Sequence, residues 1–298
     1  MATETIEMSC IDAADHARSW REHGYIHLRA AISQAQVRKT IAAIFEFLEM
    51  DEHEPADWYD DARRARSGID SRGRIPFYHH QTLWENRQTP AIHAAYAQIF
   101  GTDDLLVSID RVNMNPPVTD AWPYDGFIHW DFDVSQRPLA PTIQGLLCLT
   151  DDEGDAGGFQ CVAGFHNELE GWLAQQPAGY ASRFPDTTGM TITPIPMKAG
   201  DYLIFHGFLP HGNRPNRSRA PRLAQYLTMF PRSALSPQAL ADRLRAYALG
   251  RPTVSTAGKP FPVLEHKAQE VGRIQLTALG QRLLGATPYP GSDQQART

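Results

Sequence analysis

The chain has 298 residues, with 28 lysines and arginines against 34 aspartates and glutamates and a formal net charge of −6. This length suits one large domain, and the mild acidity argues against nucleic-acid binding, which usually requires a basic stripe. Three scattered cysteines without a C-x-x-C pair exclude a disulfide framework and a structural zinc site. No apolar run approaches the roughly 18 residues of a membrane span, and the acidic N-terminus lacks the plan of a signal peptide, so we expect a cytoplasmic protein.

The N-terminal part, to about residue 102, is predicted to be mostly helical. A short helix precedes a strand over 24–28, and an S-x-x-Q capping box opens a helix over about 33–50, where apolar residues recur at helical spacing. Residues 51–75 are charged and aperiodic, which indicates a long loop, and loops of this length are often functional. A second helix is predicted over about 90–100.

From about residue 103 to 232 the sequence predicts a β-core. Short strand-like segments are separated by clusters of glycine, proline and aspartate, and no helical pattern lies between them. Many short strands at this spacing favour an antiparallel sandwich or barrel. The predicted strands are 105–109, 127–132, 142–149, 159–162, 191–195, 202–205 and 222–230.

A C-terminal helix and tail over 233–298 complete the predicted plan. The helix begins with Ser236 as its cap and ends at Gly250, and a tail follows with a short apolar segment over 276–284. Because no internal repeat divides the chain, we interpret residues 1–298 as one domain. Its fold class is mainly β with flanking helices (α+β).

Two features of the predicted core point to a metal site. The first is His129-Trp130-Asp131. Residues two apart on a strand share a face, so an imidazole and a carboxylate would lie together, about 7 Å apart at Cα. An H-x-D sequence also occurs by chance, and a histidine on an apolar strand is more often an ordinary core residue. This pair alone therefore does not establish a site.

The second feature is the run GDYLIFHGFLPHGNRPNRSRAPR, which places His206 and His211 at the end of a later strand. Either histidine, together with the H-x-D pair, gives two imidazoles and one carboxylate. This is the ligand set of a facial triad, which leaves positions of an Fe(II) ion open. Arg222 opens the next strand, and its guanidinium, which is costly to bury alone, would meet an anion such as a dicarboxylate co-substrate.

These residues resemble the phytanoyl-CoA dioxygenase family of Fe(II)/2-oxoglutarate-dependent oxygenases. The resemblance runs from about residue 24 to 230 and includes HGYIHLRAAIS, the H-x-D pair, LTDDEGDAGGFQCVAGFH and the long run above. The family pattern has an asparagine five residues and an arginine eleven residues after its metal-binding histidine. It therefore selects His211, followed by Asn216 and Arg222, and leaves His206 as a neighbouring residue. The family's Pro-Gly-Ser-His turn is Ala-Gly-Phe-His here, which concerns loop packing.

The resemblance implies a double-stranded β-helix, a cupin-like jelly-roll barrel. It implies that His129, Asp131 and His211 hold Fe(II), that 2-oxoglutarate chelates this iron and meets Arg222 through its far carboxylate, and that O2 is the oxidant. A small organic molecule would be hydroxylated or otherwise oxidised, with release of succinate and CO2. Halogenation is disfavoured, because halogenating members replace the carboxylate ligand with a small residue and Asp131 is present.

Several further residues are weaker candidates. Gln144 occupies a family position that often faces the co-substrate, and Asn113 would face the cavity from an earlier strand. Asn216 would either contact the co-substrate or cap a turn. His79 and His80 precede the core, where a lid role competes with a packed or solvated one.

Two alternatives belong to other functional classes. A metal-binding cupin-type barrel with hydrolytic or isomerising activity would share the ligands but would not need Arg222. A non-catalytic scaffold would not need all three ligands. We expect a free small-molecule substrate, as in secondary metabolism, because the cluster of Arg63, Arg64 and Arg66 fits a solvated loop rather than a site for the phosphates of coenzyme A. We expect no nucleic-acid or membrane partner, and the sequence does not indicate an oligomeric state.

Overall fold

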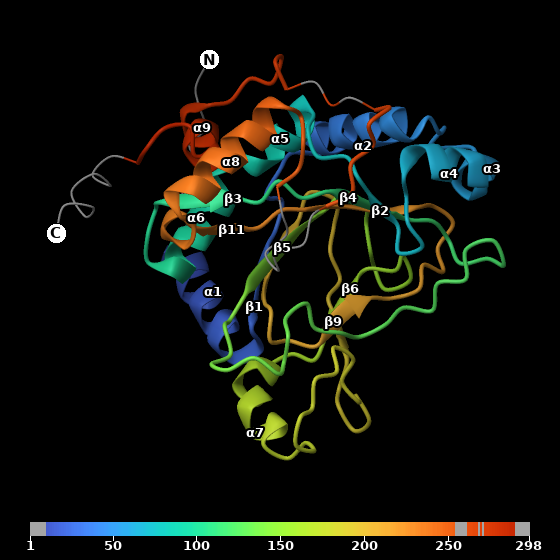
Figure 1. Cartoon of the computed structure of the whole chain (residues 1–298). Helices are drawn as coiled ribbons and strands as arrows, with labels where there is room; N and C mark the ends of the chain where they lie inside the picture. The colour runs from blue at the N-terminus through green and yellow to red at the C-terminus, as the bar shows by residue number, and fades with distance from the viewer. Residues whose placement is uncertain (1–9, 254–260, 268, 270, 290–298) are drawn as a thin grey trace.

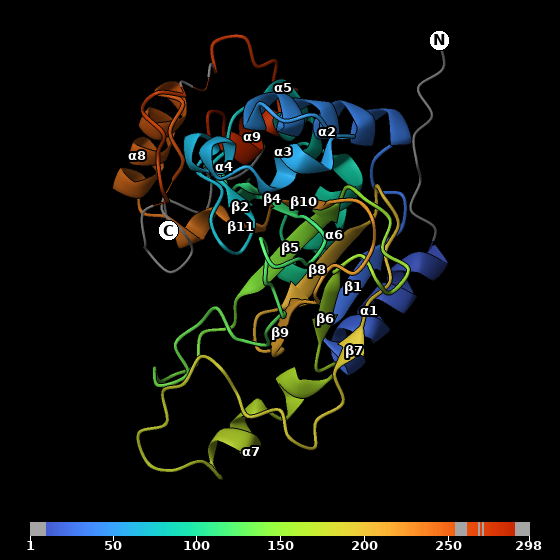
Figure 2. The same cartoon turned by 90° about the vertical axis from the view of Figure 1, so that its right-hand side faces the viewer.

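The computed structural model describes residues 10–253, 261–267, 269 and 271–289. Its centre is a six-stranded antiparallel sheet in the order β1-β8-β5-β10-β4-β2 (Figures 1 and 2). These strands are β1 (Tyr25–Leu28), β8 (Tyr202–His206), β5 (Ile143–Cys148), β10 (Arg222–Tyr226), β4 (Val112–Asn115) and β2 (Arg74–Ile75). Two smaller sheets are formed by β7 (Thr193–Pro194), β6 (Phe159–Cys161) and β9 (His211–Asn213), and by β11 (Met229–Pro231) and β3 (Leu105–Val107).

The six-stranded and three-stranded sheets pack against each other through one apolar layer. In the large sheet, Ala224 lies opposite both Asn113 and Cys148, so these side chains share the inner face. The apolar layer combines Leu146, Cys148, Leu203 and Phe205 of the large sheet with Phe159 and Cys161 of the small one. Two facing antiparallel sheets form the expected jelly-roll arrangement.

The outer face of the large sheet is covered by helices. Its buried side chains, such as Leu147 and Ile204, belong to the same apolar cluster as Ile44 and Leu83 of the helical layer. The helices around the sheet are α1 (Cys10–His23), α2 (Gln34–Leu48), α5 (Gln81–Arg87), α6 (Pro90–Phe100), α8 (Pro237–Ala248) and α9 (Ala278–Leu284). A short helix, α7 (Leu169–Leu173), lies at the end of the molecule opposite α2 (Figures 1 and 2).

The helix predicted over 33–50 is confirmed as α2. Ser33 caps it, with its Oγ accepting from the backbone N of Gln36 at 3.2 Å. The side chain of Gln36 does not complete the capping box; it donates to Thr82 O and to Asn86 Oδ1, and thereby ties α2 to α5. The helix predicted over 90–100 is confirmed as α6, and the segment over 276–284 contains α9.

The prediction of a loop over 51–75 is wrong. This segment contains two helices, α3 (Pro55–Tyr59) and α4 (Asp61–Ser67), and it ends in β2. Each helix is too short to show an apolar period, and each begins at an acidic cap, Glu54 and Asp60, whose carboxylate accepts from a backbone N–H of the first turn.

Three expectations within the core are also corrected. Residues 127–132 do not form a regular strand, because only an isolated bridge joins His129 to His211. Helix α7 interrupts the strands between β6 and β7. The strand predicted over 222–230 is divided at Thr228, which accepts a backbone bond from Ser108 and a side-chain bond from the N–H of Gly145. The chain therefore leaves the large sheet and pairs with β3 instead.

Among the described residues, no helix is long and apolar enough to cross a bilayer. The extreme N-terminus on which the expected localisation partly rested, residues 1–9, lies outside the described residues, as do parts of the C-terminal tail over 254–260 and 290–298.

Candidate metal centre and co-substrate site

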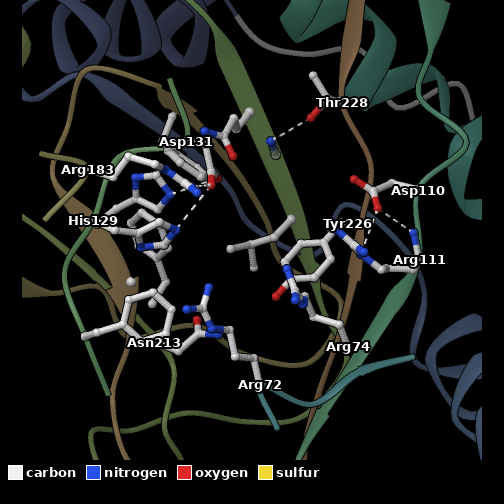
Figure 3. Close-up of a pocket in the computed structure, with 18 of the residues that line it drawn as sticks. Arg72, Arg74, Asp110, Arg111, His129, Asp131, Arg183, Asn213, Tyr226 and Thr228 are labelled. Atoms are coloured by element: carbon white, nitrogen blue, oxygen red, sulfur yellow. Dashed lines mark hydrogen bonds and ion pairs between the residues drawn. The ribbon is translucent and has the colours of Figure 1, made fainter. Parts of the chain in front are cut away.

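Three side chains that can bind a metal meet beside the small sheet. Two of them, His129 and Asp131, are labelled in Figure 3. His129 pairs with His211, at the start of β9, through two backbone hydrogen bonds of 2.9 and 3.0 Å. Asp131 follows two residues later. Its Oδ1 lies 3.3 Å from His129 Nε2, and its Oδ2 lies 3.6 Å from His211 Nε2. The three ligand atoms all lie within 4.8 Å of one another, so they fit a single metal ion.

The protonation states of this triad suit a divalent cation. Partial burial raises the pKa of Asp131, but its interactions with the neighbouring rings of His129 and His211 outweigh that effect and hold this pKa well below its usual range. Burial lowers the pKa of His129. His211 Nδ1 lies 2.9 Å from Leu209 O, and donation to that carbonyl leaves the lone pair of Nε2 directed to the site. An anionic carboxylate beside neutral imidazoles is the form that binds metal.

Arg183 contacts the triad from the segment between α7 and β7. Its Nη2 donates to Asp131 Oδ1 at 2.8 Å, and its Nε donates to Trp130 O at 2.9 Å. The backbone N of Trp130 donates in turn to Arg183 O. No motif around Arg183 signals this role in the sequence. Trp130 itself is buried in the core, and its indole N–H donates to Phe208 O.

A cavity of ≈ 940 Å³, counting the part that opens to solvent, extends from the triad. Its walls are partly aromatic, with Phe127, Phe159 and Phe205 near the ligands. Gln144 also lines the cavity, and its Nε2 is buried without a partner. The charged residues around the cavity are Arg72, Arg74, Arg111, Arg183, Asp110 and Asp131 (Figure 3).

Arg222 does not itself line this cavity, but its charge acts on Tyr124 and Tyr226, which do. It is 1% exposed, and it shares the inner face of β10 with Tyr226, four residues along the strand, which does line the cavity. Its Nη1 donates to Asn113 Oδ1 at 3.1 Å, whereas its Nε has no partner. No ion pair among the described residues includes Arg222. A buried guanidinium with unused donors is suited to an anion.

Neither of the two candidate asparagines, Asn113 and Asn216, lines the cavity. Asn113 accepts from Arg222 and donates through Nδ2 to Arg72 O at 2.9 Å, so it positions Arg222 without lining the cavity. The Nδ2 of Asn216 donates to Asn115 O and Ala220 O, and its Oδ1 accepts from the N–H and the hydroxyl of Ser218. These bonds fit the turn-capping alternative, and the structure does not bring Asn216 to the cavity.

The remaining candidate histidines lie outside the cavity. His206 packs against Trp20 and His166, its Nδ1 accepts from the N–H of Phe208, and burial lowers its pKa to about 4. This leaves His211 as the second imidazole of the triad.

His79 and His80 have packing and capping contacts. His79 is buried between Trp84 Nε1 and Arg251 O. His80 caps α5, with its ring accepting from the N–H of Thr82. Both sets of contacts fit structural roles.

Comparison with known proteins places the chain in a family. The phytanoyl-CoA dioxygenase (PhyH) family matches residues 20–224, a span that includes the triad and Arg222. The chain belongs to the phytanoyl-CoA dioxygenase family. Among relatives, it is 22% identical over 272 residues to the Ava biosynthesis cluster protein O of Aspergillus versicolor, covering 81% of this chain and 86% of that protein. It is 25% identical over 225 residues to the 1-deoxypentalenic acid 11-beta-hydroxylase of Streptomyces exfoliatus, covering 68% and 75%.

A solved structure shows the same fold. The epimerase SnoN, in complex with Fe3+, alpha ketoglutarate and nogalamycin RO, superposes with a TM-score of 0.53 at 16% identity, covering 86% of this chain and 97% of that one. For this member of the phytanoyl-CoA dioxygenase family, iron fits the two imidazoles and the carboxylate, and 2-oxoglutarate fits the unpartnered donors of Gln144 and Arg222. Family and site together support an oxygenase-type function.

Proposed function

We propose that the protein is an Fe(II)/2-oxoglutarate-dependent oxygenase that hydroxylates, or otherwise oxidises, a small organic molecule of secondary metabolism, with release of succinate and CO2. The observation that carries this proposal is the convergence of His129, Asp131 and His211 at one end of a cavity. Such a triad binds one face of an octahedral ion and leaves the opposite face open. Iron and 2-oxoglutarate, when bound there, supply the activation of dioxygen.

The residues of this chain would bind and orient the reactants. The triad holds the metal, Arg222 pairs with the far carboxylate of 2-oxoglutarate, and Asn113 keeps the guanidinium of Arg222 in place. Gln144 offers its free Nε2 to the same co-substrate. The aromatic wall beside the triad excludes water from the reacting atoms.

The reaction type rests on Asp131. A complete triad supports hydroxylation over halogenation, because the carboxylate occupies the position that a halide would need. The relative named as a hydroxylase supports the same choice. Structural likeness to an epimerase at 16% identity concerns the fold alone and does not select a reaction.

Succinate release tests the proposal. The metal-stripped protein is supplied with Fe(II), ascorbate and 2-oxoglutarate under air, and succinate is quantified. We expect release with Fe(II), and none with Zn(II) or without oxygen. Absence of iron binding, or of succinate under every condition with a substrate panel, would contradict the proposal and favour a hydrolytic or isomerising barrel, which consumes no 2-oxoglutarate.

A further inference from the structure

One of the arginines that line the cavity has no carboxylate partner among the described residues. The side chain of Arg72 points into the cavity (Figure 3), where its guanidinium carbon lies 4.7 Å from the ring centroid of Phe127. No ion pair among the described residues includes Arg72. The other three cavity arginines each contact a carboxylate: Arg74 with Asp70 at 2.6 Å, Arg111 with Asp110 at 3.4 Å, and Arg183 with Asp131 at 2.8 Å.

The backbone around Arg72 is held in a tight turn. Asp70 Oδ1 accepts from the backbone N of Arg72 and from that of Arg74, at 3.0 Å each. Between them, Gly73 has a φ of +74°, and a Cβ there would clash with the carbonyl oxygen of Met114. The carbonyl of Arg72 accepts from Asn113. The turn therefore fixes the position of Arg72, while its exposed side chain remains available to a ligand.

The charges around the cavity do not balance when the metal and co-substrate are included. The four arginines face three carboxylates, those of Asp70, Asp110 and Asp131. A divalent iron and a dianionic 2-oxoglutarate cancel each other, and Arg222 adds a further positive charge beside the co-substrate, so two positive charges are left over. Within a partly enclosed site such a charge attracts an anion.

We propose that Arg72 binds the carboxylate of the substrate, which is an organic acid with an apolar body. This inference rests on the proposed function and adds its substrate class. A guanidinium matches a carboxylate with two parallel hydrogen bonds. Phe127, beneath Arg72, packs against His129 with ring centroids 4.7 Å apart, so the carboxylate is held one aromatic ring from a metal ligand. The apolar body then lies along Phe159 and Phe205, beside the triad.

Matched acids and amides test this assignment. The protein is loaded with Fe(II) and saturating 2-oxoglutarate without oxygen, and binding is measured by calorimetry for three pairs: 1-naphthoate and 1-naphthamide, cyclohexanecarboxylate and its amide, and decanoate and decanamide. We expect at least one acid to bind ten times more tightly than its amide, or about 1.4 kcal/mol. In Arg72→Gln that ratio should fall to within about twofold of one. Arg66→Gln, which removes an exposed arginine paired with Glu49 outside the cavity, should keep it.

Three results would overturn the assignment. The first is that no acid of the set binds more tightly than its amide. The second is that the preference for the acid survives in Arg72→Gln. The third is that Arg72→Gln weakens the binding of 2-oxoglutarate rather than the binding of the acid. The last result would mean that Arg72 binds the co-substrate instead of the substrate. Failure of the proposed function looks different, because the wild-type protein then fails to bind Fe(II) and 2-oxoglutarate before any acid is added. Binding of each acid and its amide can still be compared on the protein without Fe(II) and 2-oxoglutarate.

Discussion

Replacing Arg222 with methionine should stabilise the ligand-free protein. The guanidinium is 1% exposed and has one amide partner and no carboxylate among the described residues. Exchange of a buried ion for an apolar side chain of similar volume is neutral or stabilising by about 1–4 kcal/mol. Asn113 loses its donor, which costs about 1 kcal/mol. We therefore expect a gain of about 1–2 kcal/mol, and a rise in Tm of about 2–4 °C for a domain of this size.

The same substitution should impair co-substrate binding. In the proposed complex, Arg222 faces the far carboxylate of 2-oxoglutarate, and removal of one partner from a buried charge pair costs about 3–5 kcal/mol. That loss corresponds to an increase in the Kd of 2-oxoglutarate of about 10²- to 4 × 10³-fold. Stability and affinity thus move in opposite directions in Arg222→Met.

Thermal unfolding with and without 2-oxoglutarate, together with calorimetric titration of the Fe(II) protein under nitrogen, measures both effects. Arg214→Met is the matched control, because Arg214 contacts the buried carboxylate of Asp152, and its loss leaves that carboxylate without its arginine partner. The control should lower Tm. A ligand-free Arg222→Met protein that melts below the wild type, or a Kd that changes by less than about threefold, would refute this reasoning.

Three further predictions concern the metal, the acid response and the Arg72 turn. Asp131→Ala should abolish iron binding and succinate release without unfolding the chain, whereas Asp133→Ala, which removes an exposed carboxylate bonded to Ser135, should keep both; equal activity of the two variants would contradict the metal assignment. Burial lowers the pKa of His79 to about 3, so the unfolded chain binds the extra proton and stability should fall below about pH 6.5, by about 1.4 kcal/mol per pH unit until pH 3. Denaturant unfolding at pH 7 and pH 5 should show a smaller fall in the free energy of unfolding for His79→Gln than for the wild type, and the wild-type fall for the exposed control His53→Gln. An equal fall in the wild type and both variants would show that His79 is not the group that titrates. Gly73→Ala should destabilise the fold by about 2 kcal/mol because of its positive φ and the clash with Met114 O, whereas Gly171→Ala, where a Cβ meets nothing within 4 Å, should not; equal stability of the two variants would mean that the turn is not constrained.

The sequence predicted the triad because its signal is local. His129 and Asp131 are two residues apart, and His211 and Arg222 lie in one run with fixed spacing. Their convergence does not depend on a regular strand, since a single bridge between His129 and His211 replaces the strand that we expected. Their roles as ligands and co-substrate anchor remain predictions. The sequence could also have predicted that Tyr226 faces the site, because it follows Arg222 by four residues on one strand face.

Arg72 and Arg183 could not be predicted from the sequence. Each lies in a segment without a period, and each reaches the cavity through a contact with a distant part of the chain. The turn of Arg72 is held by the bond from the N–H of Met114 to Gly73 O, and Arg183 by its backbone bond with Trp130. Such pairings depend on tertiary geometry, which neither composition nor spacing encodes.

The apolar layer between the sheets has a consequence for the lifetime of the protein. Cys148 and Cys161 both lie in it, and burial raises their thiol pKa to about 11 and about 12. Oxidation of cysteine proceeds through the thiolate, so both side chains stay in their unreactive form at neutral pH. Cys161 lies opposite His211 in the small sheet, so a protein that activates dioxygen at this site would thereby resist oxidation of its own thiols over repeated turnovers.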